Sequence, residues 1–152
     1  MTGVPIEVWE DLTGMTVLRK SLLPDSGGPG RQRGGLGQEI VLRNDTGHDI
    51  TLSCLSGRAE YPPRGFLGGE PGSLRRYDIN GIPAHPKRRH VLKPGDVFRI
   101  IEPGGGGFGP KSEWDPSLVR HDLQHGSPIW KTPWARPCRP AAACRAIRVA
   151  SG

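Results

Sequence analysis

Three glycine-rich segments are the part of this sequence whose residue types and spacing best fit a chemical role. The most pronounced is Gly104–Gly109, which follows the apolar segment Val97–Ile101 almost directly. Glycine loses more entropy on ordering than any other residue, so an ordered run of glycines indicates a backbone that approaches something closely. Segments 26–37 and 62–72 have a similar composition. We therefore expect a wall of backbone near an active site or a subunit interface.

The candidate binding residues lie in these segments. Arg31 and Arg33 follow the first glycines, and Arg64 follows a pair of prolines. Guanidinium groups on a backbone-rich loop can hold a carboxylate or a phosphate through paired hydrogen bonds, although ion pairs inside a larger protein are the alternative. The expected substrate or interface surface also includes the backbone of Gly104, Gly105, Gly106, Gly107 and Gly109. No Ser-His-Asp or Cys-His set has a readable spacing, so the catalytic residues stay unknown.

Two motifs match the sequence patterns of cofactor sites but lack the other features that such sites require. Gly104–Gly109 fits G-x-G-x-x-G, but a dinucleotide site needs this loop to open a helix after a strand. Pro110 follows instead, where a P-loop would have its lysine, and it removes a backbone N–H. His121 and His125 are spaced like the histidines of zinc proteases, yet no convincing third ligand follows. We expect neither a nucleotide site nor a metal site in this chain.

The elements that must position these residues read as short strands. Period-two patterns bounded by turn residues predict strands over 6–10, 15–23, 38–43, 48–55, 73–79, 82–85, 89–92 and 97–102. Asn44–Gly47 and the pair Asn80-Gly81 predict hairpins between the strands on either side. One helix is expected from an N-cap at Asp115 to Gly126. The predicted fold class is mainly β: antiparallel strands and hairpins, long glycine-rich loops and one short C-terminal helix.

Charge and hydropathy argue against two common classes of partner. Of the net charge of +6 on 152 residues, most lies in 127–152, which contains five basic residues and no acidic one. The rest of the chain is nearly neutral and lacks a basic stripe with interleaved aromatics, so we expect no nucleic-acid partner. No apolar stretch has transmembrane length and no secretory signal is readable, so we expect no membrane partner and a cytoplasmic location.

Four stretches resemble the C-terminal part of the hydantoinase B/oxoprolinase family, in the family's order. They are PDSGGPGRQRGGLG (24–37), LSGRAEYPPRGFLGGEPG (55–72), LKPGDVFRIIEPGGGGFG (92–109) and DPSLVRHDLQHG (115–126). The resemblance implies that 5–126 is the C-terminal part of such a domain. The change in composition predicts that 127–152 is a basic, Pro/Arg-rich tail, disordered or frame-shifted. Because members of the family are much longer, this chain resembles a fragment.

The resemblance also implies a function. It implies a fragment of an ATP-dependent hydrolase subunit that opens cyclic amides such as 5-oxoproline or N-methylhydantoin. ATP and a divalent metal would serve the parent enzyme without being bound fully by this chain. The implied partner is an ATP-binding hydantoinase A-type subunit or domain, and we expect the isolated chain to be inactive. Two alternatives stay open: a subunit of a related ATP-dependent ketone carboxylase, and a non-catalytic binding or assembly module.

Overall fold

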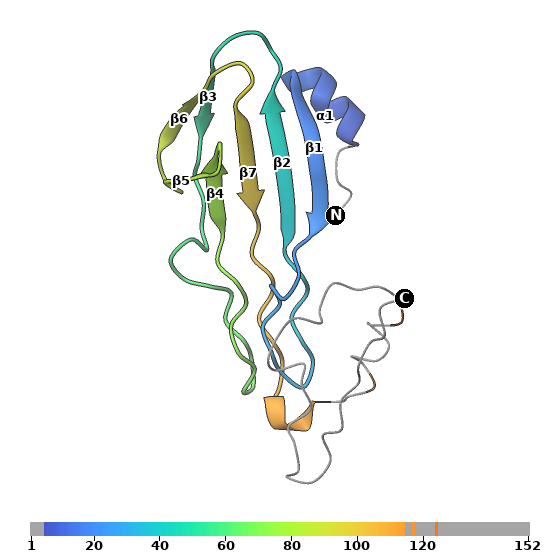
Figure 1. Ribbon diagram of the computed structural model, residues 1–152. Helices are drawn as coiled ribbons and strands as arrows, with labels where there is room; N and C mark the ends of the chain where they lie inside the picture. Colours follow the sequence, from blue (N-terminus) through green and yellow to red (C-terminus); the bar gives the residue numbers. More distant parts are fainter. Residues whose placement is uncertain (1–4, 115–116, 118–123, 125–152) are drawn as a thin grey trace, which may run out of the picture.

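The computed structural model describes residues 5–114 together with Ser117 and Gln124. One helix and seven strands follow in the order α1 (Ile6–Thr13), β1 (Met15–Leu22), β2 (Gln38–Asn44), β3 (Ile50–Ser53), β4 (Arg76–Ile79), β5 (Ile82–Ala84), β6 (Arg89–Leu92) and β7 (Val97–Ile101), and the 3-10 turn η1 (Lys111–Glu113) comes last. The molecule is elongated, with the strands at one end and the glycine-rich segments at the other (Figure 1). The prediction of a mainly antiparallel β fold is confirmed.

The strands form two antiparallel sheets. Five of them pair in the order β1-β2-β7-β4-β5, and β3 pairs with β6 in a separate two-stranded sheet. In the larger sheet Leu42 lies opposite Phe98, and Ile40 lies opposite Ile100. Because side chains alternate between the two faces of a strand, these four share one apolar face. The β4–β5 hairpin turns at Asn80-Gly81, as predicted.

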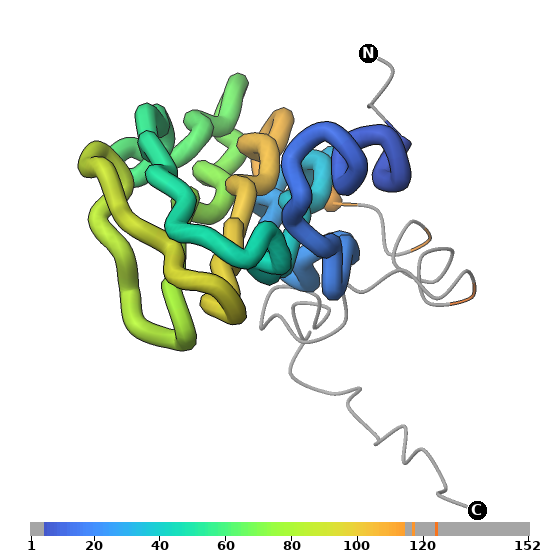
Figure 2. Tube along the Cα trace, turned by 90° about the horizontal axis from the view of Figure 1, so that it is seen from above, coloured from blue at the N-terminus to red at the C-terminus, as the bar shows by residue number. Residues whose placement is uncertain are grey.

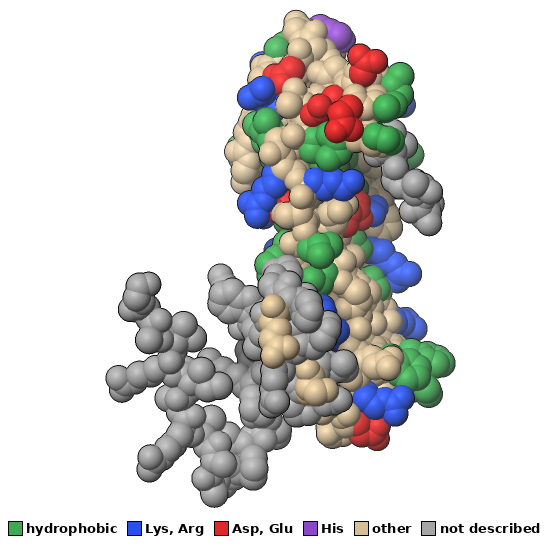
Figure 3. All heavy atoms as spheres, turned by 90° about the vertical axis from the view of Figure 1, so that its right-hand side faces the viewer, with side chains coloured by type: hydrophobic (Ala, Val, Ile, Leu, Met, Phe, Trp, Pro, Cys, Tyr) green, Lys and Arg blue, Asp and Glu red, His purple; other side chains and the backbone are tan. Residues whose placement is uncertain are grey.

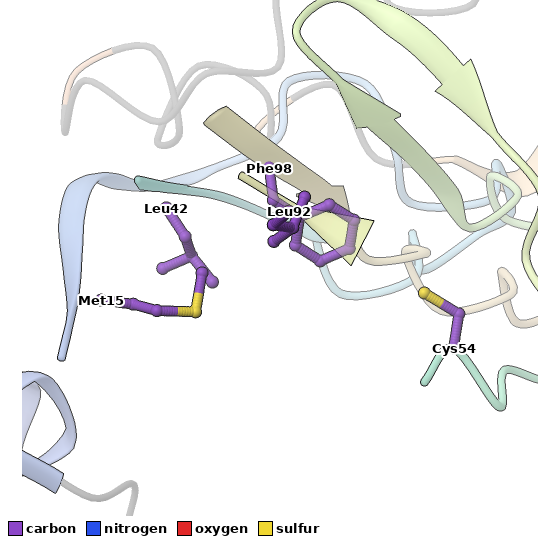
Figure 4. Packing of buried hydrophobic residues seen from close by; sticks show 5 residues of the cluster. All are labelled: Met15, Leu42, Cys54, Leu92 and Phe98. Carbon is purple, nitrogen blue, oxygen red and sulfur yellow. The ribbon is translucent and has the colours of Figure 1, made fainter. Parts of the chain in front are cut away.

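The core lies between this apolar face and the smaller sheet. Leu92 of β6 is fully buried, and Phe98 is 2% exposed. Figure 4 shows Leu92 against the Phe98 ring and Met15 beside Leu42. On the sheet, Tyr77 stacks on Phe98 with the ring centroids 5.5 Å apart. The core is small, as expected for a chain with few aromatic residues.

The predicted strand over 6–10 is wrong, because this segment begins helix α1. Pro5 precedes the helix, and Gly14 ends it in the left-handed conformation with a φ of 67°. Glycine adopts this conformation at no steric cost and therefore commonly follows the last residue of a helix. Ile6 and Trp9, three residues apart, both line a hollow over the apolar face of the sheet. Seen from above, α1 lies at the β1 end of the molecule (Figure 2).

The predicted hairpin between 38–43 and 48–55 is also wrong in its pairing. A strand does follow at Ile50–Ser53, but it pairs with β6 and not with β2. The reason is that β1 and β7 already occupy both edges of β2. At the end of β2, the side-chain amide of Asn44 donates to the carbonyl of Leu92 at 2.9 Å and to that of His48 at 3.0 Å. These bonds link the end of β2 to the end of β6 in the smaller sheet. Of the helix predicted over 115–126, the structure describes only Ser117 and Gln124, both helical.

Candidate functional site

The three glycine-rich segments pack side by side in a bundle below the larger sheet (Figure 1). The segment 104–109 is the centre of this bundle. Segment 26–37 folds back on itself along one side of it, and segment 63–73 folds back along the other, as the backbone hydrogen bonds to both segments show. We call this arrangement the glycine bundle.

The central segment turns with a repeat of three residues. A Cβ atom added at Gly104 would lie 2.1 Å from the carbonyl oxygen of Ser26, and one added at Gly107 would lie 2.1 Å from that of Pro29. Both glycines therefore face the same neighbouring segment. The same repeat relates Gly105 to Phe108, whose amides donate to the carbonyls of Gly35 and Gln32. The segment therefore has three residues per turn, and none of the residues 104–107 has a positive φ. Both features are those of a polyproline-II helix.

Some positions of the neighbouring segments that face this helix are glycines as well. A Cβ atom would lie 2.0 Å from the Gly105 oxygen if added at Gly34, and 2.1 Å from the Gly107 oxygen if added at Gly69. Real side chains do not approach backbone atoms so closely, so only glycine fits. Collagen requires glycine at its axis for the same steric reason.

The backbone amides at the centre of the bundle find their partners inside it. The amide of Gly105 donates to Gly35 at 2.9 Å, and that of Gly107 donates to Glu70 at 2.9 Å. In return, Gly28 and Phe66 donate to the carbonyls of Gly105 and Gly107, both at 2.8 Å. A nucleotide phosphate does not fit the G-x-G-x-x-G segment, because most of its backbone N–H groups already donate to the surrounding chain, which also packs closely against its glycines. That the five predicted glycines bind a ligand stays a prediction.

The three candidate arginines lie on the outer surface of the bundle. The guanidinium of Arg31 lies 5.6 Å from the centre of the Phe108 ring, and its Nη1 lies 3.6 Å from a carboxylate oxygen of Glu113. Arg64 is exposed and Arg33 is half-buried. Arg31 therefore contacts both the end of the central segment and η1. That the three arginines bind an anion stays a prediction.

The other face of the larger sheet carries a row of charged residues that the sequence did not predict. Glu39 is only 6% exposed, yet it lies 3.2 Å from Arg19 and 2.6 Å from Arg99, measured between charged atoms. Arg99 also reaches Asp78 at 3.3 Å. The sequence contains one signal of this row: Arg99 interrupts the apolar run of β7. Because side chains alternate along a strand, Arg99 lies on the face of the sheet that Phe98 does not share. This row joins β1, β2, β7 and β4.

Two hollows flank the larger sheet. One has a volume of about 320 Å³ and is lined by Arg75, Arg76, Asp78 and Arg99 among others. The other, of about 270 Å³, lies between α1 and the apolar face, with Trp9 and Ile40 in its lining. In the part of the chain that the structure describes, no group of three His, Cys, Asp or Glu residues is placed to hold a metal ion.

The histidine pair His121 and His125 lies outside the described residues, as does the tail 127–152. Among the helices that the structure describes, none is long and apolar enough to cross a membrane.

The fold and the bundle together define a class: an antiparallel β domain whose connections form a polyglycine bundle. The family model for hydantoinase B/oxoprolinase matches residues 1–111. The chain therefore belongs to the hydantoinase B/oxoprolinase family.

Curated relatives and solved structures agree with this assignment. The chain is 35% identical to 5-oxoprolinase 1 of Arabidopsis thaliana, over 68% of this chain and 8% of the relative. It is 30% identical to caprolactamase subunit beta of Pseudomonas jessenii, over 80% of this chain and 22% of the relative. The fold resembles ATP-dependent caprolactamase from P. jessenii, with a TM-score of 0.71 at 22% identity over 82% of this chain and 23% of that one. It also resembles nucleotide-free acetone carboxylase, with a TM-score of 0.67 at 19% identity over 84% of this chain and 22% of that one. The chain thus spans less than a quarter of the length of these relatives.

Proposed function

We propose that this chain is the C-terminal region of a hydantoinase B-type subunit in an ATP-dependent enzyme that opens cyclic amides. One observation carries the proposal: relatives at 30% identity or more are named for the hydrolysis of ring amides, as 5-oxoprolinase and as a caprolactamase subunit. The substrate class is a small lactam or hydantoin. 5-Oxoproline and N-methylhydantoin are the candidates that we favour.

Within such an enzyme the described residues act as a scaffold. The glycine bundle holds several chain segments in register without flexible side chains, and the sheet above it fixes where each segment begins. Most backbone N–H donors of the G-x-G-x-x-G segment are used within the bundle, so we assign ATP and its divalent metal to an ATP-binding hydantoinase A-type partner. A rigid scaffold of this kind can hold substrate-binding loops within the narrow tolerance that catalysis requires.

The related carboxylase reaction is the second candidate, and it has weaker support. Acetone carboxylase resembles this chain in fold at 19% identity, a level that carries the fold alone. Curated relatives at 30% identity or more are named for hydrolases, as 5-oxoprolinases and as a caprolactamase subunit. For this reason we place hydrolysis first.

The test is a chimera of P. jessenii caprolactamase in which residues 1–111 of this chain replace the matching region of subunit beta. We expect ATP-dependent opening of caprolactam, 5-oxoproline or N-methylhydantoin by the chimera, and none by the 152-residue chain alone. A folded, assembled chimera that carboxylates acetone but opens no ring would overturn the proposal in favour of the carboxylase. An assembled chimera without either activity would leave the role as a non-catalytic module.

A further inference from the structure

The turn between β4 and β5 holds the one asparagine of this sequence that is followed by glycine. The sequence contains two asparagines, Asn44 before Asp45 and Asn80 before Gly81. Asparagine is one of the thermolabile residues of proteins. A following glycine promotes its loss, because a residue without a side chain leaves its backbone nitrogen free to attack the neighbouring amide. Asn80 is exposed, whereas Asn44 is fully buried.

The reaction open to this pair is deamidation, which needs no reactant other than water. The backbone nitrogen of Gly81 attacks Cγ of Asn80, so an N–Cγ bond forms and the Cγ–Nδ2 bond breaks. Nδ2 leaves as ammonia and takes the proton of the Gly81 amide with it. Water then opens the cyclic imide at one of its two carbonyls and gives aspartate or isoaspartate. Because the first step is intramolecular, its rate depends on the freedom of the turn.

In the folded chain, three hydrogen bonds hold Asn80 against the start of β7. Its backbone amide donates to the carbonyl of Val97 at 2.8 Å. In its side chain, Nδ2 donates to Oδ1 of Asp96 at 2.8 Å, and Oδ1 accepts from the amide of Val97 at 2.9 Å. The side chain must leave both partners before Cγ can turn back to the Gly81 nitrogen. Folding therefore slows the reaction.

The hairpin that carries this turn is placed to open without the rest of the sheet. β5 has three residues and lies at the edge of the larger sheet. Its first residue, Ile82, is 70% exposed, and a Cβ atom added at Gly81 would meet nothing within 4 Å. Segments with so little burial open at a lower free-energy cost than a buried core.

We propose that Asn80 is a deamidation site, protected by the folded hairpin and reactive when the β4–β5 turn opens. An aspartate product places a second carboxylate against Asp96, and an isoaspartate product adds a backbone atom to a two-residue turn. Acidic side chains already gather near this strand end of the molecule, on the face that Figure 3 shows. The modification thus makes a transient opening of the sheet edge permanent. The site is a property of this turn and holds whether or not the enzyme acts as proposed.

The first arm of the test follows both asparagines by peptide mass spectrometry in the full 152-residue chain, folded and in urea. We expect Asn80 to lose its amide about tenfold faster in urea than in the folded chain. Asn44, followed by a bulkier residue, is the internal control and should react more slowly in both states. Equal rates at Asn80 in the two states would overturn the protection, and no reaction at Asn80 in urea would overturn the site.

Two variants test the groups that control the rate. Gly81→Ala should slow the loss of the Asn80 amide in urea, because its methyl group hinders the attacking nitrogen. In the folded chain, Asp96→Ala removes the partner of Nδ2 and should speed the loss about fivefold, with the rate in urea unchanged. Asp49→Ala, which removes an exposed carboxylate elsewhere, is the matched control. A folded-state rate for Asp96→Ala equal to that of the control would overturn the protective role of the hydrogen bond.

The last arm measures the consequence of the reaction. Asn80→Asp imitates the aspartate product, and we expect it to lower the melting temperature by about 4 °C or more through repulsion from Asp96. Asn80→Gly removes the same side-chain hydrogen bonds, suits the positive φ of 51° and adds no charge, so its melting temperature should fall less. A melting temperature for Asn80→Asp equal to that of the parent would overturn the permanent opening of the edge.

Discussion

At the scale of single residues, Asn44 does the most to join the two sheets. Its side chain is fully buried, and all its polar atoms are used. The amide nitrogen donates to the carbonyls of His48 and Leu92, while Oδ1 accepts from the amide of Thr46 at 3.1 Å and from its hydroxyl at 2.7 Å. One side chain thus links the end of β2, the turn that follows it and the end of β6.

We expect Asn44→Ala to lower the free energy of unfolding by about 3 kcal/mol, because it leaves the buried Leu92 carbonyl without this donor. Urea unfolding of the variant measures the loss. Gln32→Ala, which removes an exposed amide, is the control and should stay within about 0.5 kcal/mol of the parent. A loss for Asn44→Ala no larger than that of the control would show that the link is dispensable.

Asp96 gives the stability a dependence on acid pH. The hydrogen bond from Asn80, at 2.8 Å, and then the backbone amide of Lys93, also at 2.8 Å, hold the pKa of Asp96 below its usual value. A carboxyl with a lowered folded-state pKa adds stability above its unfolded pKa. That stability is lost as the pH falls through the folded value.

We therefore expect Asp96→Asn to lower the melting temperature at pH 7 and to lower it less near pH 2, because the parent loses this stabilising charge as the pH falls through the lowered pKa of Asp96. Thermal unfolding between these two pH values measures the effect, and Asp49→Asn controls for the loss of an exposed charge. An equal drop at both pH values would point to lost geometry and not to lost charge.

At the scale of elements, the central segment of the glycine bundle behaves as a polyproline-II helix and not as a loop. It has no side chains to bury between Gly104 and Gly107, so its stability comes from backbone contacts and hydrogen bonds with its neighbours. The requirement for glycine therefore differs along the bundle, according to whether a position faces another segment or open space.

Two single substitutions separate these cases. A Cβ atom at Gly106 would lie 2.1 Å from the Arg64 carbonyl oxygen, whereas one at Gly35 meets nothing within 4 Å. We expect Gly106→Ala to lower the free energy of unfolding by about 3 kcal/mol through overpacking. Gly35→Ala should be neutral or stabilise by about 0.5 kcal/mol, because alanine restricts the unfolded chain. Similar urea-unfolding curves for both variants would contradict the close packing of the bundle.

At the scale of the whole molecule, the sheet and the bundle form one continuous structure. The central segment of the bundle continues from β7, and the connection between β1 and β2 forms one of its sides (Figure 1). Hydrogen bonds extend the ladder across the junction, from Leu23 to Gly37 at 2.8 Å and from Glu102 to Gln38 at 2.7 Å. Opening the bundle would therefore disturb the strands above it.

We expect the two parts to unfold as one cooperative unit. Hydrogen exchange at the amide of Gly107, in the bundle, should report the same opening free energy as exchange at Phe98, in the sheet core. The amide of Gly47, in an exposed turn, is the fast-exchanging control. Exchange at Gly107 as fast as at Gly47 would show that the bundle opens by itself.

Local sequence determined the elements that depend on neighbouring residues. The strands at 15–23 and 38–43 and the Asn80-Gly81 turn were predicted correctly, because alternation and turn chemistry act within a few residues. The four consecutive glycines also indicated close backbone approach correctly. The strand predicted over 6–10 was wrong, because a loose alternation over so few residues is also compatible with a helix. That helix ends at Gly14.

Only the tertiary structure decided what those glycines approach and how the strands pair. The surfaces facing Gly104–Gly107 come from Ser26–Gly35 and from Arg64–Gly72, segments far away in the sequence. Because β1 and β7 occupy both edges of β2, β3 pairs with β6 and not with β2, and the buried amide of Asn44 bonds across to β6. Glycine has no side chain that could specify a partner, and a hydrogen bond across the fold leaves no periodicity in the sequence. The close packing of the glycine backbone could therefore be predicted from the sequence, whereas the segments that pack against it could not.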